Sequence, residues 1–283
     1  KLFNFAKYSW LGSLRGRSFN DGDILILGAL VAPGLVGVYS VAWSLTSFIG
    51  VFGSSIRTTA FPELSKADSE GDEELFEAVV TDTLAFSGLV AIPGLFGGVL
   101  LAERVMRLYG EAFGRGATVL GLLIMAMLLY DYQNQLLNAL NGLDRPDLSF
   151  RVNAGFIIVN LGLNIFLVLI IGFEGAAVAT VLAAGFGTVL AFVYLRRILS
   201  FVIPVTEILR QTGAALIMSV IVLAGRSVVR LSPIAGNNAA VVTILVTIGA
   251  GTYFIVLLAI SRQFRTAIAE NAPARLPFVT DIK

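Results

Sequence analysis

The sequence predicts an all-α protein, a polytopic membrane bundle of about eight transmembrane helices, and three observations carry that prediction. The mean hydropathy of the chain is +0.85. Hydrophobic residues make up 57% of the 283 positions, and charged residues make up only 14%, against about a quarter in an average soluble domain. Uncharged intervals of about 20 residues recur along the chain, which is the length that an α-helix needs to cross a bilayer. Lipid is therefore the expected solvent.

The individual spans follow from the positions of the scarce charges. Clear uncharged intervals lie at 83–102, 152–173, 175–195 and in the apolar centre of 231–261. Two further intervals are shorter or interrupted: 211–225 extends past Arg226 if that side chain snorkels to the interface, and 116–143 contains Asp131 near its middle.

The first part of the chain needs a different solution. The 33 uncharged residues between Asp23 and Arg57 would form one helix about 50 Å long, too long for one span and too short for two. Pro33-Gly34 is a turn signal inside this interval, so we expect two helices that meet there, the first beginning in the polar stretch before Asp23. The eight expected helices are 4–31, 36–60, 77–102, 115–141, 150–171, 175–196, 206–228 and 239–261.

The distribution of positive charge orients these helices. Of the Lys and Arg residues, 13 fall on the side of the chain termini and 5 on the opposite side. Because cytoplasmic loops are enriched in Lys and Arg, both termini are expected in the cytoplasm of a multi-pass protein of the cytoplasmic (plasma) membrane. The segment 63–77 carries seven acidic residues and is expected to be a solvated cytoplasmic loop.

The composition also excludes several kinds of chemistry. The chain contains neither Cys nor His, which excludes disulfides, thiol nucleophiles, Ser-His-Asp triads and typical zinc sites. The net charge is +1 and the basic residues are scattered, so nucleic-acid binding is not expected. We expect no catalytic residues, no metal site and no cofactor, and therefore no enzyme.

Ionisable residues within the predicted spans are the first candidates for a functional site. Such groups are costly in a membrane and usually face a bundle interior or a water-filled cavity. Arg15, Arg17, Asp21 and Asp23 fall within or close to the first span, and Arg17 and Asp21 are spaced to pair on one helix face. The alternative is that the early positions lie at the interface and snorkel.

Polar residues in later spans form a second group of candidates. Asp131 and Gln133 belong to the polar band Tyr-Asp-Tyr-Gln-Asn-Gln at 130–135, which suits either a cavity lining or hydrogen bonds between helices. Asn160 and Asn164 lie one turn apart on one helix face, and packing between helices is the expected role of this pair.

The order and spacing of several short motifs resemble a known family. The motifs are DILILG at 23–28, VGVYSVA at 36–42, FPELS at 61–65, LYGEAF at 108–113, GFEGAAVAT at 172–180, and the pair Asn160 and Asn164. Over residues 1–197 the chain resembles the C-terminal portion of Wzx-type oligosaccharide or polysaccharide flippases, proteins of polysaccharide biosynthesis in the multidrug/oligosaccharidyl-lipid/polysaccharide (MOP) exporter superfamily.

This resemblance implies a domain organisation. Residues 1–197 would be the second six-helix bundle of a MATE/MOP-type transporter, 198–261 two additional transmembrane helices, and 262–283 a cytoplasmic tail. The N-terminal bundle would be missing from this sequence, which agrees with Lys1 in place of Met.

The resemblance also implies a transport function. The protein would flip a polyprenyl-linked or, in archaea, dolichyl-linked glycan across the cytoplasmic membrane by alternating access. Its partners would be the lipid-linked glycan, the bilayer, the missing bundle and a glycan polymerase or glycosyltransferases. Arg15 and Arg17 would donate to the glycan phosphate, since Arg binds phosphate in a bidentate way. Asp23 matches the family's recurrent acidic position and would couple to a cation or proton, or pair with an arginine.

Two alternatives remain open at this stage. A lipid II flippase or multidrug exporter of the same superfamily would share the fold. A membrane glycosyltransferase would use Asp21 and Asp23 as a D-x-D motif for a divalent cation, although such an enzyme needs a cytoplasmic sugar-nucleotide domain and no loop exceeds about 20 residues.

Overall fold

The structure is a computed structural model that describes residues 22–229 and 236–271, and these two ranges are helical apart from turns and short linkers. The described elements in chain order are α2 (Asp23–Leu30), α3 (Pro33–Glu70), α4 (Glu73–Met106), the 3-10 helices η2 (Arg107–Tyr109) and η3 (Glu111–Gly116), α5 (Ala117–Gly142), α6 (Pro146–Ile171), α7 (Phe173–Arg196), α8 (Val205–Val229), α9 (Asn238–Ile260) and α10 (Arg262–Asn271). The predicted all-α class is confirmed for this part of the chain.

Seven of the described helices, α3 to α9, are long and apolar enough to cross a membrane. Each of them overlaps one of the last seven predicted spans, because an uncharged interval of about 20 residues marks the part of a helix that can cross the bilayer. The remaining predicted span, 4–31, lies mostly outside the described residues, and α2 is its final part. The break between α2 and α3 falls at Val31 and Ala32, with Pro33 in the first turn of α3, as the turn signal predicts.

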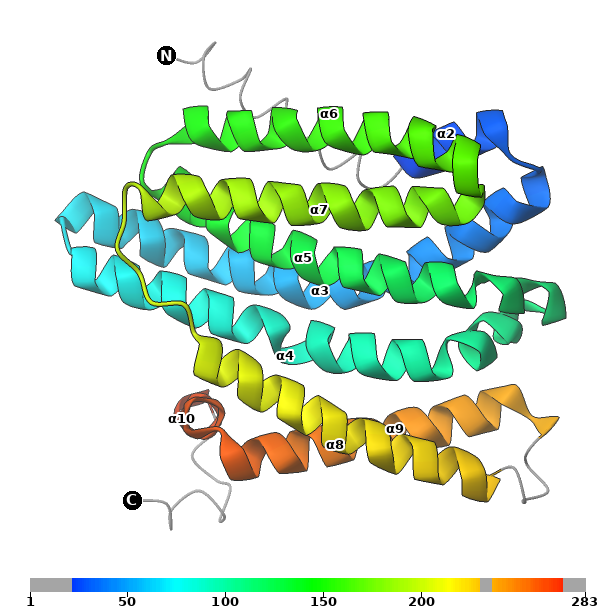
Figure 1. The fold of residues 1–283 in the computed structure, drawn as a ribbon. Coiled ribbons are helices and arrows are strands. Elements are labelled where there is room, and N and C mark those ends of the chain that lie inside the picture. The colour runs from blue at the N-terminus through cyan, green and yellow to red at the C-terminus, as the bar shows by residue number, and fades with distance from the viewer. Residues whose placement is uncertain (1–21, 230–235, 272–283) are drawn as a thin grey trace.

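The helices form a bundle with one pair attached at its edge (Figure 1). The central helix α5 contacts α3, α4 and α7, and α7 in turn contacts α6. The pair α8 and α9 lies at the opposite edge from α6 and reaches the bundle mainly through α4. Two side chains of α8 donate to α4 carbonyls: Gln211 Nε2 to Ala85 O and Arg226 to Leu100 O, both at 2.8 Å.

The prediction of an acidic loop at 63–77 is wrong, since the segment is helical apart from a tight turn. The 38 residues of α3 continue to Glu70, and α4 begins at Glu73. Leu64 and Ala67 are buried against Phe76, so the hairpin has its own small core beyond the apolar interval. Gly71 has φ +68° and ends α3, and the Asp72 side chain caps α4 by accepting from Leu75 N. Amphipathic packing and caps extend the helices into water.

The C-terminal part also differs from a simple tail. Residues Arg262–Asn271 form α10, whose Phe264 is buried in the cluster shared by α8 and α9. The Gln263 side chain donates to Asp82 of α4 at 2.7 Å. This short helix therefore packs against the bundle instead of leaving it.

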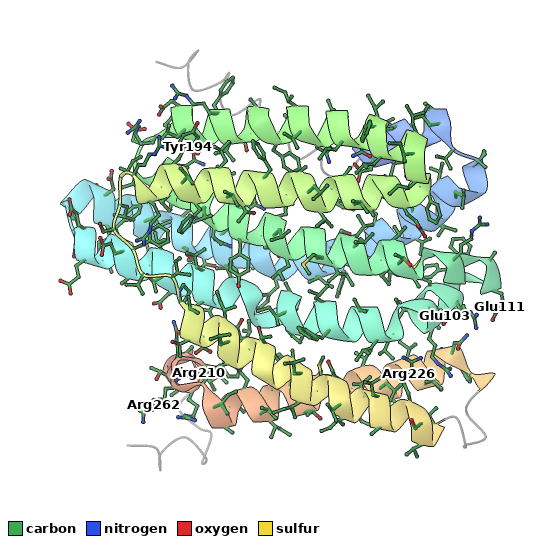
Figure 2. The ribbon with its side chains drawn as sticks, in the orientation of Figure 1. Glu103, Glu111, Tyr194, Arg210, Arg226 and Arg262 are labelled. Atoms are coloured by element: carbon green, nitrogen blue, oxygen red, sulfur yellow. The ribbon has the colours of Figure 1, made fainter. Side chains whose placement is uncertain are left out.

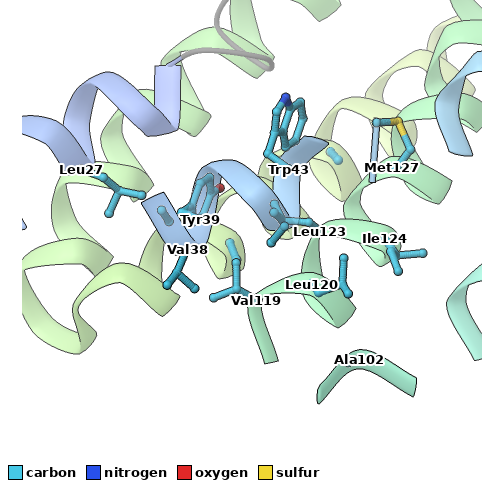
Figure 3. Close-up of a cluster of buried hydrophobic side chains, with 14 of the residues drawn as sticks. Leu27, Val38, Tyr39, Trp43, Ala102, Val119, Leu120, Leu123, Ile124 and Met127 are labelled. Carbon is cyan, nitrogen blue, oxygen red and sulfur yellow. The ribbon is translucent and has the colours of Figure 1, made fainter. Parts of the chain in front are cut away.

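Apolar packing fixes the position of α2 and of the first half of α3. Figure 3 shows the cluster in which Leu27 of α2 and Tyr39 and Trp43 of α3 lie near Leu123 and Met127 of α5. The outer face of α6 is different, because its large apolar side chains are exposed, among them Ile165, Phe166 and Leu169. A membrane supplies the solvent that such a face needs.

Candidate functional site

A buried carboxylate joins four helices at the beginning of α2. Asp23 is 1% exposed. Its Oδ1 accepts from Asn164 Nδ2 of α6 at 2.7 Å, and its Oδ2 lies 2.5 Å from Thr180 Oγ1 of α7. The Tyr39 hydroxyl of α3 also donates to Oδ2. We call Asp23, Tyr39, Asn160, Asn164 and Thr180 the Asp23 centre.

The local sequence explains why these side chains converge. The small residues Ala176, Ala179 and Ala183 surround Thr180 on the buried face of α7, so α7 lies close to its neighbours. Asn160 and Asn164 both lie on the inner face of α6, as their spacing predicts, and both are 0% exposed. Asn164 does more than pack between helices, because its amide binds the Asp23 carboxylate.

The Asp23 centre has more polar atoms than its internal hydrogen bonds use. Both side-chain polar atoms of Asn160 and the Oδ1 atom of Asn164 are buried without a hydrogen-bond partner in the described part of the chain. Thr180 Oγ1 also lies 3.0 Å from the Ala176 carbonyl oxygen. Carboxylate, amide, hydroxyl and carbonyl oxygens together are the ligands that hard cations take. A proton or one monovalent cation would neutralise the single carboxylate.

A second polar region lies between α5 and its neighbours. Asp131 is 4% exposed and packs against Gly53 of α3, where an added Cβ would lie 2.5 Å from the Asp131 carboxyl carbon. Two other side chains on the same face of α5 bind backbone carbonyls of α3. Gln135 Nε2 donates to Gly53 O at 3.1 Å, and Asn138 Nδ2 donates to Arg57 O at 3.2 Å. Asp131 Oδ2 has no hydrogen-bond partner among the described residues.

Gln133 faces a different neighbour from Asp131. It is 0% exposed and packs against Gly187 of α7, where an added Cβ would lie 2.5 Å from Gln133 Nε2. Neither of its polar side-chain atoms has a hydrogen-bond partner in the described ranges. Both predicted residues of the band are thus enclosed between helices in this conformation.

The structure separates the predicted site residues into two regions. Asp23 lies with Asn160 and Asn164, whereas Asp131 and Gln133 lie farther along the bundle. Tyr39 and Gly53, which contact the two aspartates from α3, are about 21 Å apart along that helix. Arg15, Arg17 and Asp21 lie outside the described residues.

Sequence reasoning missed Tyr39, Thr180 and Arg57. Tyr39 and Thr180 belong to the motifs VGVYSVA and GFEGAAVAT, but uncharged hydroxyls do not stand out until a carboxylate is placed beside them. Arg57 carries a visible signal, because it is the first charged residue after Asp23. The charge distribution predicts that it lies toward the cytoplasmic end of the second helix, and in the structure it lies inside α3, where its carbonyl accepts from Asn138 of α5.

The exposed face of α3 is unlike that of α6. It carries hydroxyl side chains in the middle of the helix, over residues 44–59, together with Phe48 and Val51; the hydroxyl residues are Ser44, Ser47, Ser54, Ser55, Thr58 and Thr59. We call these six residues the hydroxyl face. A cavity of about 350 Å³ adjoins it between α3 and α4, lined in part by Ser55, Thr59 and Asp82. This polar character suits contact with water better than contact with lipid.

A second surface feature is apolar and lies between α4, α8 and α9. It is a groove of about 320 Å³ whose lining includes Pro93 and Gly97 of α4, Met218 of α8, and Leu245 and Gly249 of α9. Figure 2 shows the same three helices with their side chains, and Arg226 lies near one end of α8. The groove is open to the surroundings of the bundle and suits a hydrocarbon chain.

Curated relatives are similar over most of this chain. It is 33% identical over 272 residues to the probable flippase AglR of Haloferax volcanii, covering 95% of this chain and 56% of that protein. It is 31% identical over 219 residues to the probable low-salt glycan biosynthesis flippase Agl15 of the same organism, covering 77% and 46%. The chain thus spans about half the length of the curated relatives it matches.

Solved structures share the fold. The lipid II flippase MurJ in an inward closed conformation superposes with a TM-score of 0.71 at 17% identity, over 87% of this chain and 52% of that one. An outward-facing MATE family transporter of the MOP superfamily gives a TM-score of 0.60 at 14% identity, over 95% and 70%. The predicted transporter fold is confirmed. The family described as lipid II flippase MurJ matches residues 24–261, and the chain therefore belongs to the MurJ family.

Proposed function

We propose that this chain is part of a flippase that moves a polyprenyl- or dolichyl-linked oligosaccharide across the cytoplasmic membrane by alternating access. The observation that carries the proposal is the Asp23 centre, a buried carboxylate that accepts hydrogen bonds from three other helices in a fold of the MurJ family. The relatives AglR and Agl15 support a glycan as the cargo. The protein would perform no covalent chemistry.

The proposed organisation gives each region a task. Residues 1–197 form one helical lobe, 198–261 add two membrane helices, and 262–283 lie in the cytoplasm, as do both chain termini. A second lobe of similar size, expected from the length of the relatives, faces the hydroxyl face of α3 across a water-filled cavity. The sugar head group would pass through that cavity, since hydroxyl side chains can replace its hydrogen bonds to water.

The apolar groove between α4, α8 and α9 would take the lipid end of the cargo. A polyprenyl chain is insoluble in the cavity and stays in hydrocarbon while the head group crosses. The groove offers apolar contact beside the bundle.

Arg15 and Arg17, the sequence-predicted cations of this lobe, would offset the desolvation of the cargo's phosphate. A glycan polymerase or glycosyltransferases would act before and after this step.

The Asp23 centre would couple the lobe to an ion. A charged Asp23 holds α2, α3, α6 and α7 together through its hydrogen bonds, and an ionised carboxylate in the membrane is costly without a neutralising partner. Binding or release of a proton or monovalent cation changes that charge and the strength of all these bonds at once. Such a change biases the two conformations that alternating access requires.

Reconstitution tests this function. The complete protein would be placed in liposomes that contain a fluorescent lipid-linked oligosaccharide, and a membrane-impermeant quencher would report how much label reaches the outer leaflet. We expect wild-type protein to expose label from the inner leaflet, and protein-free liposomes to retain it. Fluorescent lipid II is the second cargo, because the MurJ family match favours it. Movement of lipid II alone would replace the glycan proposal, and movement of neither would overturn it.

A further inference from the structure

The linker between α7 and α8, residues 197–204, lies over an apolar pocket at the edge of the bundle (Figure 1). The pocket has a volume of about 210 Å³ and a hydrocarbon wall. Four helices and the linker contribute to that wall, among other residues through Leu84, Leu136, Val189, Phe192, Phe201 and Ile208. The pocket shares none of its lining residues with the groove between α4, α8 and α9, so it is a separate feature.

The pocket opens to the surroundings of the bundle. Val189 in its wall is 63% exposed, and Ile203, which also lines it, is 41% exposed. An apolar cavity of about 150 Å³ is large enough to hold a benzene molecule. The pocket therefore has room for a segment of one hydrocarbon chain. Because a bilayer surrounds the bundle, lipid chains are the hydrocarbon that reaches this opening.

A guanidinium lies beside the aromatic part of the pocket. Arg196 is the last residue of α7, about one turn beyond Phe192. Its guanidinium carbon is 5.8 Å from the centre of the Phe192 ring and 5.4 Å from the centre of the Phe201 ring. Arg196 Nη1 also donates to Phe201 O at 2.8 Å. Both rings line the pocket, so these contacts hold a positive charge at its end.

No acidic side chain balances this positive charge in the part of the chain that the structure describes. Arg197 follows Arg196, and both are exposed. No carboxylate of the described residues lies within 4.0 Å of either guanidinium. The charge distribution of the sequence predicts that this end of α7 lies on the cytoplasmic side. The two arginines would there meet the lipid head groups of a leaflet that carries anionic lipids.

The linker is held in place over the pocket. Thr81 Oγ1 of α4 donates to Val202 O at 3.1 Å. The rings of Phe192 and Phe201 meet edge to face, with their centroids 5.9 Å apart. The apolar pocket and the guanidinium therefore have a fixed relation to each other, as a binding site for a molecule with a hydrocarbon part and an anionic part requires.

We propose that this pocket and Arg196 bind an anionic phospholipid of the cytoplasmic leaflet. One hydrocarbon chain occupies the pocket, and the phosphate accepts from the Arg196 guanidinium, whose planar fork matches phosphate oxygens. The ligand is a lipid of the membrane and not the cargo, so the inference goes beyond the proposed function. The lipid fills space between α7 and α8. It thus helps to hold the α8–α9 pair, which reaches the bundle mainly through α4.

The first experiment measures lipid binding to the purified, delipidated complete protein by native mass spectrometry. The probes are phosphatidylglycerol and phosphatidylcholine with the same diphytanoyl chains, and glycerol phosphate as a head group without chains. We expect one tightly bound phosphatidylglycerol per protein, weaker binding of phosphatidylcholine, whose choline cation offsets the phosphate charge, and no retention of glycerol phosphate. Equal affinity for the two lipids, or retention of glycerol phosphate, would overturn the proposal.

Variants of Arg196 test the contact with the head group. We expect R196Q to bind phosphatidylglycerol about tenfold more weakly, since a hydrogen-bonded charge is lost. R196K keeps the charge and should keep most of the preference for the anionic lipid. The matched control is R151Q, which removes an exposed arginine of α6 and should bind as the wild type does. Wild-type affinity in R196Q would contradict the assignment.

A tryptophan in the opening tests the pocket itself. We expect V189W to lose the tightly bound phosphatidylglycerol, and I158W, on the outer face of α6 where residue 158 is 72% exposed, to retain it. The lipid should raise the melting temperature of I158W and of the wild type, but not that of V189W, because only a folded protein with an open pocket binds it. Retention of the lipid by V189W would show that it binds elsewhere.

The rival occupant is the chain of a lipid-linked cargo, which farnesyl phosphate represents. We expect an equal concentration of farnesyl phosphate to leave phosphatidylglycerol bound, because the second chain of the phospholipid adds contact with the exposed wall at Val189 and Ile203. Displacement of phosphatidylglycerol would show that the pocket serves the cargo and would overturn the proposal. Failure to flip any cargo in liposomes would contradict the proposed function and leave this binding result unchanged.

Discussion

The Thr180 side chain illustrates how a single hydroxyl contributes to the Asp23 centre. It is buried in α7 and lies 2.5 Å from Asp23 Oδ2, so it helps to satisfy a carboxylate that water does not reach. Asn164 and Tyr39 satisfy the rest of that carboxylate from other helices. Loss of one donor leaves the others in place, which makes Thr180 suitable for measuring the strength of a single bond.

We expect Thr180→Val to destabilise the protein by about 1.5–3 kcal/mol, the usual size of a hydrogen bond to a charged group. Valine keeps the shape of threonine, so packing changes little. Thr180→Ser keeps the hydroxyl and is the matched control. Thermal unfolding in detergent measures the difference, and equal melting temperatures for the valine and serine variants would show that this bond contributes nothing to stability.

The residues of the Asp23 centre differ in how far the sequence alone predicts their roles. Asp23 stands out because a charge in an apolar span is rare, and the structure places it at the centre of a hydrogen-bonded group. For Asn164 the sequence predicts packing alone, since nothing in it says that residue 164 meets residue 23. Contacts across 141 positions depend on the tertiary arrangement of four helices, which no local pattern contains.

At the scale of the elements, the contact between α3 and α5 depends on a glycine. Gly53 lets the Asp131 side chain lie directly against the α3 backbone, beside the hydrogen bond from Gln135 Nε2 to Gly53 O. A side chain at position 53 would displace Asp131 and Gln135 from the α3 backbone. Gly37, on the same helix, is different, because a methyl group added there would meet no described atom within 4 Å.

We expect Gly53→Ala to destabilise the protein by about 1–3 kcal/mol through overpacking. Gly37→Ala should leave stability unchanged or raise it slightly, because alanine is the better helix former. Chemical unfolding of both variants in the same detergent compares them. Two equally stable variants would contradict the packing described for the α3–α5 contact.

The sequence predicts the ends of a helix best where the helix is as long as its apolar interval. The intervals 150–171 and 175–196 agree with α6 and α7 to within a few residues, since a helix that crosses a bilayer is expected to end near the end of its apolar interval. The ends of α3 and α4 were not predictable in this way. Their final turns lie beyond the apolar interval and are held by the buried contact of Leu64 and Ala67 with Phe76.

On the scale of the whole molecule, two outer faces of the bundle differ in polarity and are therefore expected to meet different solvents. The hydroxyl face of α3 is expected to meet water in the cavity of the complete transporter, whereas the outer face of α6 meets lipid tails. The 283 residues contain no cysteine, so a single introduced thiol is the only one among them.

We expect Ser54→Cys to react with a membrane-impermeant thiol reagent, and Phe166→Cys to remain unmodified in the same membranes. Both side chains are exposed on the bundle, so accessibility within the protein does not distinguish them. The fraction of labelled protein is read by mass spectrometry. Labelling of residue 166 but not of residue 54 would reverse the assignment of the two faces.

In the proposed mechanism, the charge of Asp23 couples an ion to the movement of the cargo. Initial rates of glycan flipping by wild type and Asp23→Asn, measured in liposomes with and without an imposed gradient of protons or monovalent cations, test it most directly. We expect a gradient to accelerate the wild type, and we expect the Asn variant, whose side chain has the same size but no charge, to flip slowly at a rate that no gradient changes. Equal acceleration of both proteins would contradict the claim.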